Sequence, residues 1–188
     1  MKTIKEYLIF KNKYAEIYNN EIIDFEGKKG THIIYGKVGE NEQDGVSILP
    51  VNDKGDVLIF REYRYGIQDY IYSIPTGSVE KDLTVFENAK KELLEESGLV
   101  SENWESLDLD IKSDPVVKNV NLHYFIARDC RRCKNNDVEK DTTESFKGYE
   151  WLDVNHLVHQ INSGEKQFNL ISLPIIYYYY ISQLRKQV

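Results

Sequence analysis

The sequence predicts an α/β (α+β) fold in which a mixed β-sheet is sandwiched between helices, with a small N-terminal β segment in front of it. Three observations predict this class. Strand-like runs rich in Tyr, Ile and Val, bounded by Asn and Gly, occupy much of the chain. Apolar residues at helical spacing interrupt these runs at residues 85–97. Two more helical segments, at residues 155–164 and 169–186, follow the last strand-like run.

Residues 1–44 predict an N-terminal β segment that is distinct from residues 45–188. Its strand-like runs lie at residues 6–12, 14–27 and 31–39 and are joined by polar turns. Three short strands are too small to bury a core of their own. We therefore expect this segment to pack on another surface, for which a second copy of the chain is a candidate.

Turn signals separate the strands of the larger part. Residues 45–66 read as two strands around the turn Asn52-Asp53-Lys54-Gly55, and a third short strand ends at Pro75. Further strand-like runs lie at residues 104–112, 119–128 and 149–154. Residues 129–148 contain almost no apolar residue, so we expect a polar loop there.

The helix at residues 85–97 has the clearest start and stop signals. Thr84 and Glu87 fit a capping box at its N-terminus, and Gly98 fits the position that ends a helix. Val85, Phe86, Ala89 and Leu93 form its apolar stripe.

The composition fits one well-filled domain and argues against some functions. With 188 residues, 41% hydrophobic and 29% charged, the chain is of ordinary globular size. Its formal net charge of −7 argues against a nucleic-acid partner, because such binders neutralise phosphates with Lys and Arg. The N-terminus has no apolar core of signal-peptide length, and the apolar run at residues 173–181 is too short to span a bilayer. We expect a soluble, cytoplasmic protein with no membrane partner.

Helix 85–97 collects three carboxylates, Glu92, Glu95 and Glu96, close to its C-terminus, where the helix dipole disfavours negative charge. At about 100° per residue, the three side chains fall within an arc of roughly 100°, away from the apolar stripe. Carboxylate oxygens that converge in this way suit Mg²⁺ or Mn²⁺. The alternative is a solvated acidic face with Lys90 and Lys91 as neighbours.

The stretch "GSVEKDLTVFENAKKELLEESGL" resembles the Nudix box, the loop–helix–loop signature G-x5-E-x7-R-E-U-x-E-E-x-G-U in which U is a bulky aliphatic residue. Seven positions match at the right spacing: Gly77, Glu92, Leu93, Glu95, Glu96, Gly98 and Leu99. Two depart. Leu83 stands where the family usually has Glu, and Lys91 replaces an Arg that orients a neighbouring glutamate. Lys keeps the charge but loses the planar two-pronged hydrogen bonding, so we expect an effect on rate.

The segments "VLIFREYRYG", "SIPTGSVE", "DTTESF" and "YEWLDVNHLVHQINSGE" are similar to the ADP-ribose pyrophosphatase branch of this superfamily. The resemblance implies the Nudix fold and Mg²⁺-dependent hydrolysis of the diphosphate bond of a nucleoside diphosphate sugar, with Mn²⁺ as a substitute. The expected substrate is ADP-ribose, hydrolysed to AMP and ribose 5-phosphate. The resemblance also implies a homodimer in which residues 1–44 exchange or pack across the interface.

The metal ligands implied by the resemblance are Glu92, Glu95 and Glu96, joined by the main-chain carbonyl of Thr76. Glu95 and Lys91 also count among the expected catalytic residues.

The loop residue Glu144 matches a carboxylate that acts as base or water-orienter, with Glu139 and Glu150 as competitors. Of these, Glu150 is expected to be structural, because it lies inside a strand beside Trp151.

The expected substrate contacts are Arg64, Arg61 and Gly77. Arg64 is the favoured phosphate contact, since a guanidinium pairs well with phosphate oxygens. For Arg61, two other interpretations have equal weight to a substrate contact: a surface residue, or an ion-pair partner of Glu62.

Several alternatives stay open. The substrate could be GDP-mannose or another nucleotide sugar, and the departures at Leu83 and Lys91 also fit a non-catalytic nucleotide-sugar sensor with this fold. Cys130 and Cys133 read either as free thiols or as half of a zinc site that a symmetric partner completes.

Overall fold

The computed structural model describes residues 1–12, 15–36, 44–112, 114–115, 120–134 and 145–186. These residues form two compact units. The first consists of Met1–Asp44 and Asp110–Leu122, and the second of Gly45–Leu109 and His123–Val188. The first unit therefore takes in residues from the middle of the chain as well as the N-terminal segment.

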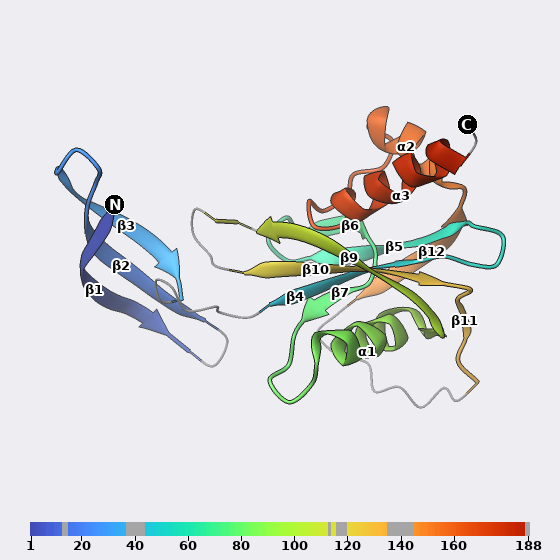
Figure 1. The fold of residues 1–188 in the computed structure, drawn as a ribbon, viewed down its shortest axis with the longest axis horizontal. Coiled ribbons are helices and arrows are strands. Elements are labelled where there is room, and N and C mark those ends of the chain that lie inside the picture. The colour runs from blue at the N-terminus through green and yellow to red at the C-terminus, as the bar shows by residue number, and fades with distance from the viewer. Residues whose placement is uncertain (13–14, 37–43, 113, 116–119, 135–144, 187–188) are drawn as a thin grey trace. The chain divides into compact units, whose positions relative to one another are not determined.

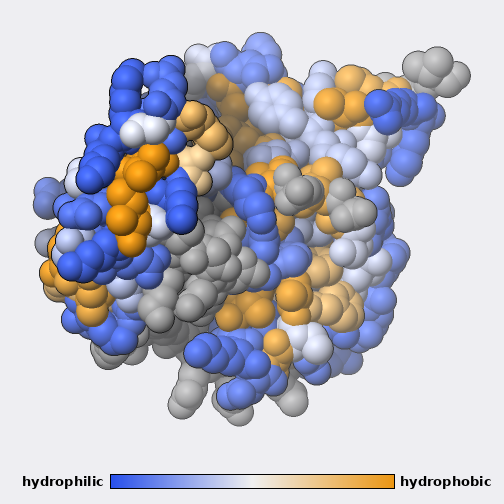
Figure 2. All heavy atoms as spheres, turned by 60° about the vertical axis from the view of Figure 1, so that its left-hand side comes forward, coloured by the Kyte–Doolittle hydropathy of each residue, from blue (hydrophilic) through white to orange (hydrophobic). Residues whose placement is uncertain are grey.

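The N-terminal strands of the first unit form an antiparallel sheet with little core of its own. Its strands are β1 (Lys2–Lys11), β2 (Glu16–Ile23) and β3 (Lys29–Tyr35), in the order β1-β2-β3. Tyr18 is buried, but many apolar side chains of the sheet are exposed: Ile4, Tyr7, Leu8, Ile9, Phe10 and Ile33. Orange hydrophobic residues interrupt the hydrophilic surface on the face of the molecule drawn in Figure 2.

The strands of the second unit lie mainly in two sheets. One sheet has the order β7-β4-β10-β9, and the other has the order β12-β5-β6. The first contains β4 (Gly45–Pro50), β7 (Thr76–Ser78), β9 (Asn103–Lys112) and β10 (Asn121–Arg128). The second contains β5 (Val57–Arg64), β6 (Asp69–Ser73) and β12 (Phe146–Leu152). A small antiparallel pair joins β8 (Leu99–Val100) to β11 (Arg131–Arg132).

The described residues form three helices, which cover both sides of these sheets. Helix α1 (Val85–Ser97) lies on one side, and α2 (Val154–Asn162) and α3 (Leu173–Lys186) lie together on the other (Figure 1). Both α1 and α3 contact β4, from opposite faces. The predicted α+β arrangement of strands between helices is thus confirmed.

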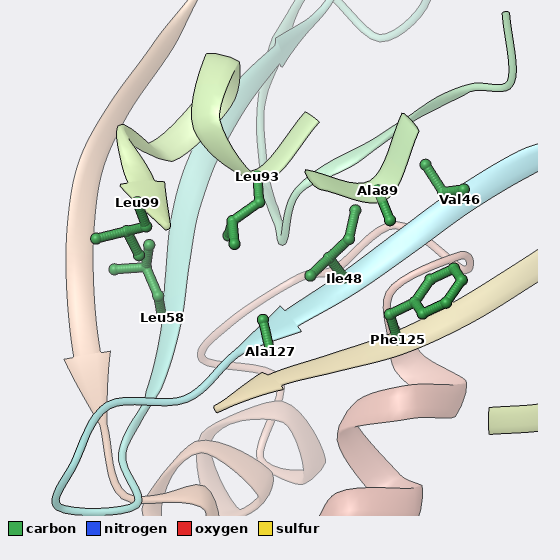
Figure 3. Close-up of a cluster of buried hydrophobic side chains, with 8 residues drawn as sticks. All are labelled: Val46, Ile48, Leu58, Ala89, Leu93, Leu99, Phe125 and Ala127. Carbon is green, nitrogen blue, oxygen red and sulfur yellow. The ribbon is translucent and has the colours of Figure 1, made fainter. Parts of the chain in front are cut away.

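Helix α1 begins and ends where its local sequence directs. The Thr84 hydroxyl accepts a hydrogen bond from the Glu87 amide, and the Glu87 carboxylate accepts one from the Thr84 amide, which completes the predicted capping box. Gly98 takes a left-handed conformation with φ of 68° and ends the helix. Figure 3 shows Ala89 and Leu93 pointing from α1 toward Ile48 on β4, within one buried cluster.

The Leu93 side chain is fully buried in this cluster, so its removal should be costly. We expect Leu93→Ala to lower the free energy of unfolding by about 2–5 kcal/mol, because the change loses apolar burial and leaves a cavity. Urea denaturation followed by circular dichroism measures this. The matched control is Leu170→Ala, at a side chain that is 73% exposed, where a change within about 0.5 kcal/mol is expected. Equal effects of the two variants would contradict the described packing.

Three details differ from the sequence expectation. Part of the predicted polar loop pairs as β11 with β8, and the Cys130 and Cys133 amides donate to the Val51 and Gly98 carbonyls. Strand β12 begins at residue 146 rather than 149. The Phe146 ring packs edge-on against the Phe60 ring there, with 5.1 Å between the ring centroids.

The C-terminal helix also begins later than expected, at residue 173 rather than 169. The Asn169 side chain accepts a hydrogen bond from the Ser172 amide and so holds the preceding residues in a turn. Among the described helices, none is both long and apolar enough to cross a membrane.

Candidate metal and diphosphate site

A short strand and a helix meet at the candidate site. Strand β7 pairs with β4 through Val46↔Gly77 and Ser47↔Thr76, so the position of residues 76 and 77 is fixed by the sheet. Helix α1 contacts both β4 and β7. Main-chain pairing and apolar packing therefore bring the second half of α1 to Thr76 and Gly77 of β7.

Glu96 is held beside β7 from two directions. Its carboxylate accepts a hydrogen bond from the Thr76 amide at 3.0 Å, and its main-chain carbonyl accepts one from the Tyr149 hydroxyl at 2.7 Å. The residue is only 4% exposed. Because burial and the nearby Glu96 disfavour a phenolate, the pKa of Tyr149 is raised and its hydroxyl stays a donor.

Glu92 approaches the same strand so closely that only glycine fits at residue 77. A Cβ atom added to Gly77 would lie 1.9 Å from Oε1 of Glu92. The glycine is therefore required for the close approach of the carboxylate. Glu92 and Glu96 thus meet at consecutive backbone positions of β7.

Glu95 lies beside a lysine. Its Oε2 atom is 3.8 Å from Nζ of Lys91, and the same ammonium donates a hydrogen bond to Glu80. This hydrogen bond raises the pKa of Lys91, which keeps the side chain charged. The structure therefore brings two of the three predicted carboxylates to β7 and places the third next to Lys91.

The donor atoms that meet between β7 and α1 fit a hard divalent cation. Glu92, Glu96 and the Thr76 carbonyl supply only oxygen, and Mg²⁺ is commonly bound by one or two carboxylates, with water and substrate phosphates as its other ligands. Within the described part of the chain, no three carboxylate, imidazole or thiol groups already form a metal cluster. Glu92, Glu96 and Thr76 are thus the residues that would hold a cation here.

The Nudix domain model matches residues 41–171, which is more than half of the chain. The chain belongs to the Nudix family. Its structure also resembles the crystal structure of an ADP compounds hydrolase, with a TM-score of 0.74 and 17% identity over 99% of this chain and 95% of that one. The predicted Nudix fold is therefore confirmed.

Curated relatives of this Nudix chain have several names. It is 26% identical over 128 residues to the ADP-ribose pyrophosphatase of Bacillus subtilis (strain 168), covering 68% of this chain and 66% of that protein. It is 30% identical over 84 residues to the ADP compounds hydrolase NudE of Escherichia coli (strain K12), covering 45% of each. It is 23% identical over 134 residues to the methanol dehydrogenase activator of Bacillus methanolicus, covering 71% and 69%. The chain thus spans less than two thirds of the length of the first two relatives. Its expected resemblance to the ADP-ribose pyrophosphatase branch is confirmed.

The two predicted arginine contacts lie on opposite faces of β5. Side chains alternate along a strand, so Arg64 shares a face with Leu58, which packs in the cluster beneath α1. Arg64 forms an ion pair with the buried Glu62 at 2.7 Å, so the ion pair suggested for Arg61 belongs to Arg64. The Arg61 guanidinium instead lies over the rings of Tyr70 and Tyr72. Of the two arginines, Arg64 is the one on the α1 side of the Nudix sheet.

The candidate loop carboxylates are placed only in part. Glu144 and Glu139 lie outside the described residues. Glu150 accepts a hydrogen bond from Lys166 at 3.0 Å, and this lysine is 6% exposed and also bonds the Tyr72 hydroxyl. These contacts fit the structural interpretation of Glu150.

Sequence reasoning missed three residues that position the site: Glu80, Asn88 and Tyr149. Asn88 is fully buried on α1. Its side chain accepts a hydrogen bond from the Glu80 amide and donates one to the Thr84 carbonyl, both at 2.9 Å. The polar Asn88 beside the apolar Ala89 was an available signal. Glu80, close before the departure at Leu83, was another. No local pattern marks Tyr149, because its partner is 53 residues away.

The two cysteines of this Nudix chain are free, and Cys130 packs against the buried cluster, where its thiol donates to the Ala127 carbonyl at 3.1 Å. Burial raises the pKa of the Cys130 thiol to about 11, although a main-chain hydrogen bond opposes the shift. The thiolate is the reactive form. We therefore expect iodoacetamide at pH 8 to alkylate Cys130 about a hundredfold more slowly than an ordinary thiol of pKa near 9.

Mass spectrometry of a Cys133→Ser variant measures this rate for Cys130 alone. The control is the same variant in urea, where alkylation at the ordinary rate is expected because unfolding removes the burial. Equal rates in buffer and in urea would show that the thiol is not protected.

Proposed function

We propose that this Nudix protein hydrolyses the diphosphate bond of a nucleoside diphosphate sugar, with Mg²⁺ as cofactor and Mn²⁺ as a substitute. The observation that carries the proposal is the meeting of Glu92 and Glu96 at Thr76 and Gly77 of β7. ADP-ribose is the proposed substrate, and AMP and ribose 5-phosphate are the products. The names of two relatives, an ADP-ribose pyrophosphatase and an ADP compounds hydrolase, support the substrate class.

The proposed reaction is the hydrolysis of the bond between one phosphorus and the oxygen that bridges the diphosphate. The oxygen of a water attacks one phosphorus, the bond from that phosphorus to the bridging oxygen breaks, and the water proton passes to a carboxylate. A divalent cation bound at the site would neutralise the diphosphate and lower the pKa of this water. Such help is needed because the chain itself carries a net charge of −7.

The protein's own residues have separate roles in this proposal. Glu92, Glu96 and the Thr76 carbonyl bind the cation, with Glu95 as a further ligand or base. The Arg64 guanidinium donates a hydrogen bond to a phosphate oxygen. Its side chain is partly exposed, and it lies on the face of β5 that is directed to α1. Glu144 is the proposed base or water-orienting residue of the neighbouring loop.

A substrate panel tests the proposal. The protein is incubated with Mg²⁺ or Mn²⁺ and with ADP-ribose, GDP-mannose or UDP-glucose, and ³¹P NMR identifies the products. We expect ADP-ribose to yield AMP and ribose 5-phosphate in equal amounts. Faster turnover of GDP-mannose would favour the second candidate substrate. Binding of a nucleotide sugar without turnover would favour the sensor and overturn the proposed hydrolysis.

We further propose that the chain forms a homodimer through its N-terminal sheet. The exposed apolar side chains of β1 and β3 need cover, and a second copy would supply it. Sedimentation should show a dimer that dissociates when residues 1–44 are deleted. A stable monomer, unchanged by the deletion, would contradict this. The cytoplasmic location expected from the sequence stays a prediction.

A further inference from the structure

The ammonium group of Lys91 lies between two carboxylates, and it favours one of them. Lys91 donates a direct hydrogen bond to Glu80, whereas Oε2 of Glu95 is 3.8 Å away. The three side chains are partly exposed, at 36% for Lys91, 52% for Glu80 and 33% for Glu95. Lys91 is thus held mainly by the loop and only secondarily by its own helix.

The loop that carries Glu80 is fastened to α1 at the level of its backbone. The amide of Glu80 donates to the side chain of Asn88, whose own amide group donates to the Thr84 carbonyl. Asn88 is fully buried, and the Leu83 amide donates back to the Glu80 carbonyl at 3.3 Å. Glu80 is therefore built into its place beside Lys91.

Lys91 has an obvious competing partner on its own helix. Residues four apart on a helix lie side by side, and Lys91 and Glu95 already form an ion pair at 3.8 Å, which would close to a hydrogen bond if nothing else held the lysine. A lysine paired with Glu95 would occupy a carboxylate of the proposed cation site. It would also place a positive charge where a cation binds.

We propose that Glu80 is a positioning residue: its hydrogen bond keeps Lys91 from closing its 3.8 Å ion pair with Glu95 to a direct hydrogen bond, and so leaves the Glu95 carboxylate available to a divalent cation. Glu80 lies three residues before Leu83, the position at which the Nudix box usually carries a glutamate. The inference rests on the proposed function, because it assumes that Glu95 belongs to the cation site. It concerns a residue outside the fixed positions of the box.

The test measures Mn²⁺ binding directly, without substrate, by electron paramagnetic resonance of free Mn²⁺. We expect Glu80→Gln to raise the dissociation constant for Mn²⁺ by about two- to fivefold, the range expected for a partly exposed ion pair. The double variant Glu80→Gln with Lys91→Met should return to within about twofold of the wild-type value, because no lysine is left to compete.

The matched control is Glu102→Gln, which breaks another exposed pair, to Arg131 at 3.9 Å, and should leave Mn²⁺ binding unchanged. Thermal melting checks that each variant is folded. Unchanged affinity in Glu80→Gln would overturn the inference. Equally weak binding in the single and double variants would also overturn it, because Glu80 would then support the loop rather than restrain Lys91.

The proposed function and this inference fail in different ways. Mn²⁺ binding that depends on Glu80, in a protein that hydrolyses no nucleotide sugar, would reject the function and support the inference. Hydrolysis of ADP-ribose with Mn²⁺ affinity indifferent to Glu80 would do the reverse. A wild-type protein that binds no Mn²⁺ would overturn both.

Discussion

Glu92→Gln should lower metal-dependent release of AMP from ADP-ribose by about a thousandfold while the protein stays folded. Gln has nearly the same shape as Glu, so the close approach to Gly77 is preserved. The change removes the negative charge, and a neutral amide is a much poorer ligand for Mg²⁺ than a carboxylate. The loss should therefore appear in activity and in Mn²⁺ affinity together.

Initial rates across a range of Mg²⁺ concentrations measure this effect. Glu102→Gln serves as control, because this carboxylate is 84% exposed and should leave the rate unchanged. Melting curves of both variants should match the wild type. Full activity in folded Glu92→Gln would remove Glu92 from the cation site.

Gly77→Ala is expected to lower the rate by about a hundredfold with little loss of stability. The new Cβ would collide with the end of the Glu92 side chain, which can swing away because a Glu side chain is flexible. The fold therefore survives, but the Glu92 carboxylate moves away from residue 77. A displaced catalytic group of this kind is known to cost orders of magnitude in rate.

The rate with ADP-ribose and the melting temperature of Gly77→Ala separate these two effects. Gly66→Ala is the matched control, because its Cβ would meet no atom within 4 Å. We expect the control to keep its activity and both variants to melt within a few degrees of the wild type. A large loss of stability in Gly77→Ala, with unchanged activity per folded molecule, would contradict the assigned reason for the glycine.

The parts of this site that could be predicted from sequence are those set by local physics. Thr84, Glu87 and Gly98 cap α1 through neighbours a few residues away, so their pattern is visible in the sequence. The resemblance to the Nudix box, rather than local physics, linked Gly77 to Glu92 as residues of one motif.

The remaining parts depend on contacts between distant segments. The Tyr149 hydroxyl reaches the Glu96 carbonyl from another strand, and β11 pairs with β8 across the end of α1. Neither pairing leaves a local pattern. The opposite faces of Arg61 and Arg64 could have been predicted, because residues three apart on a strand point to opposite sides.

The structure also explains why α1 tolerates carboxylates at its C-terminal end. The Thr76 amide donates a hydrogen bond to Glu96, and the Lys91 ammonium lies 3.8 Å from Glu95, so part of the unfavourable charge at these two carboxylates is offset. The remaining repulsion is what a bound cation would relieve.

The most direct test of the central claim compares Mn²⁺ binding with AMP release from ADP-ribose in the wild-type protein. The claim is that the α1 carboxylates bind a cation that promotes diphosphate hydrolysis. We predict that AMP release is abolished by EDTA and that, as Mn²⁺ is added back, it rises in parallel with site occupancy. AMP release that persists at full rate in EDTA, or Mn²⁺ binding with no release at any occupancy, would contradict the claim.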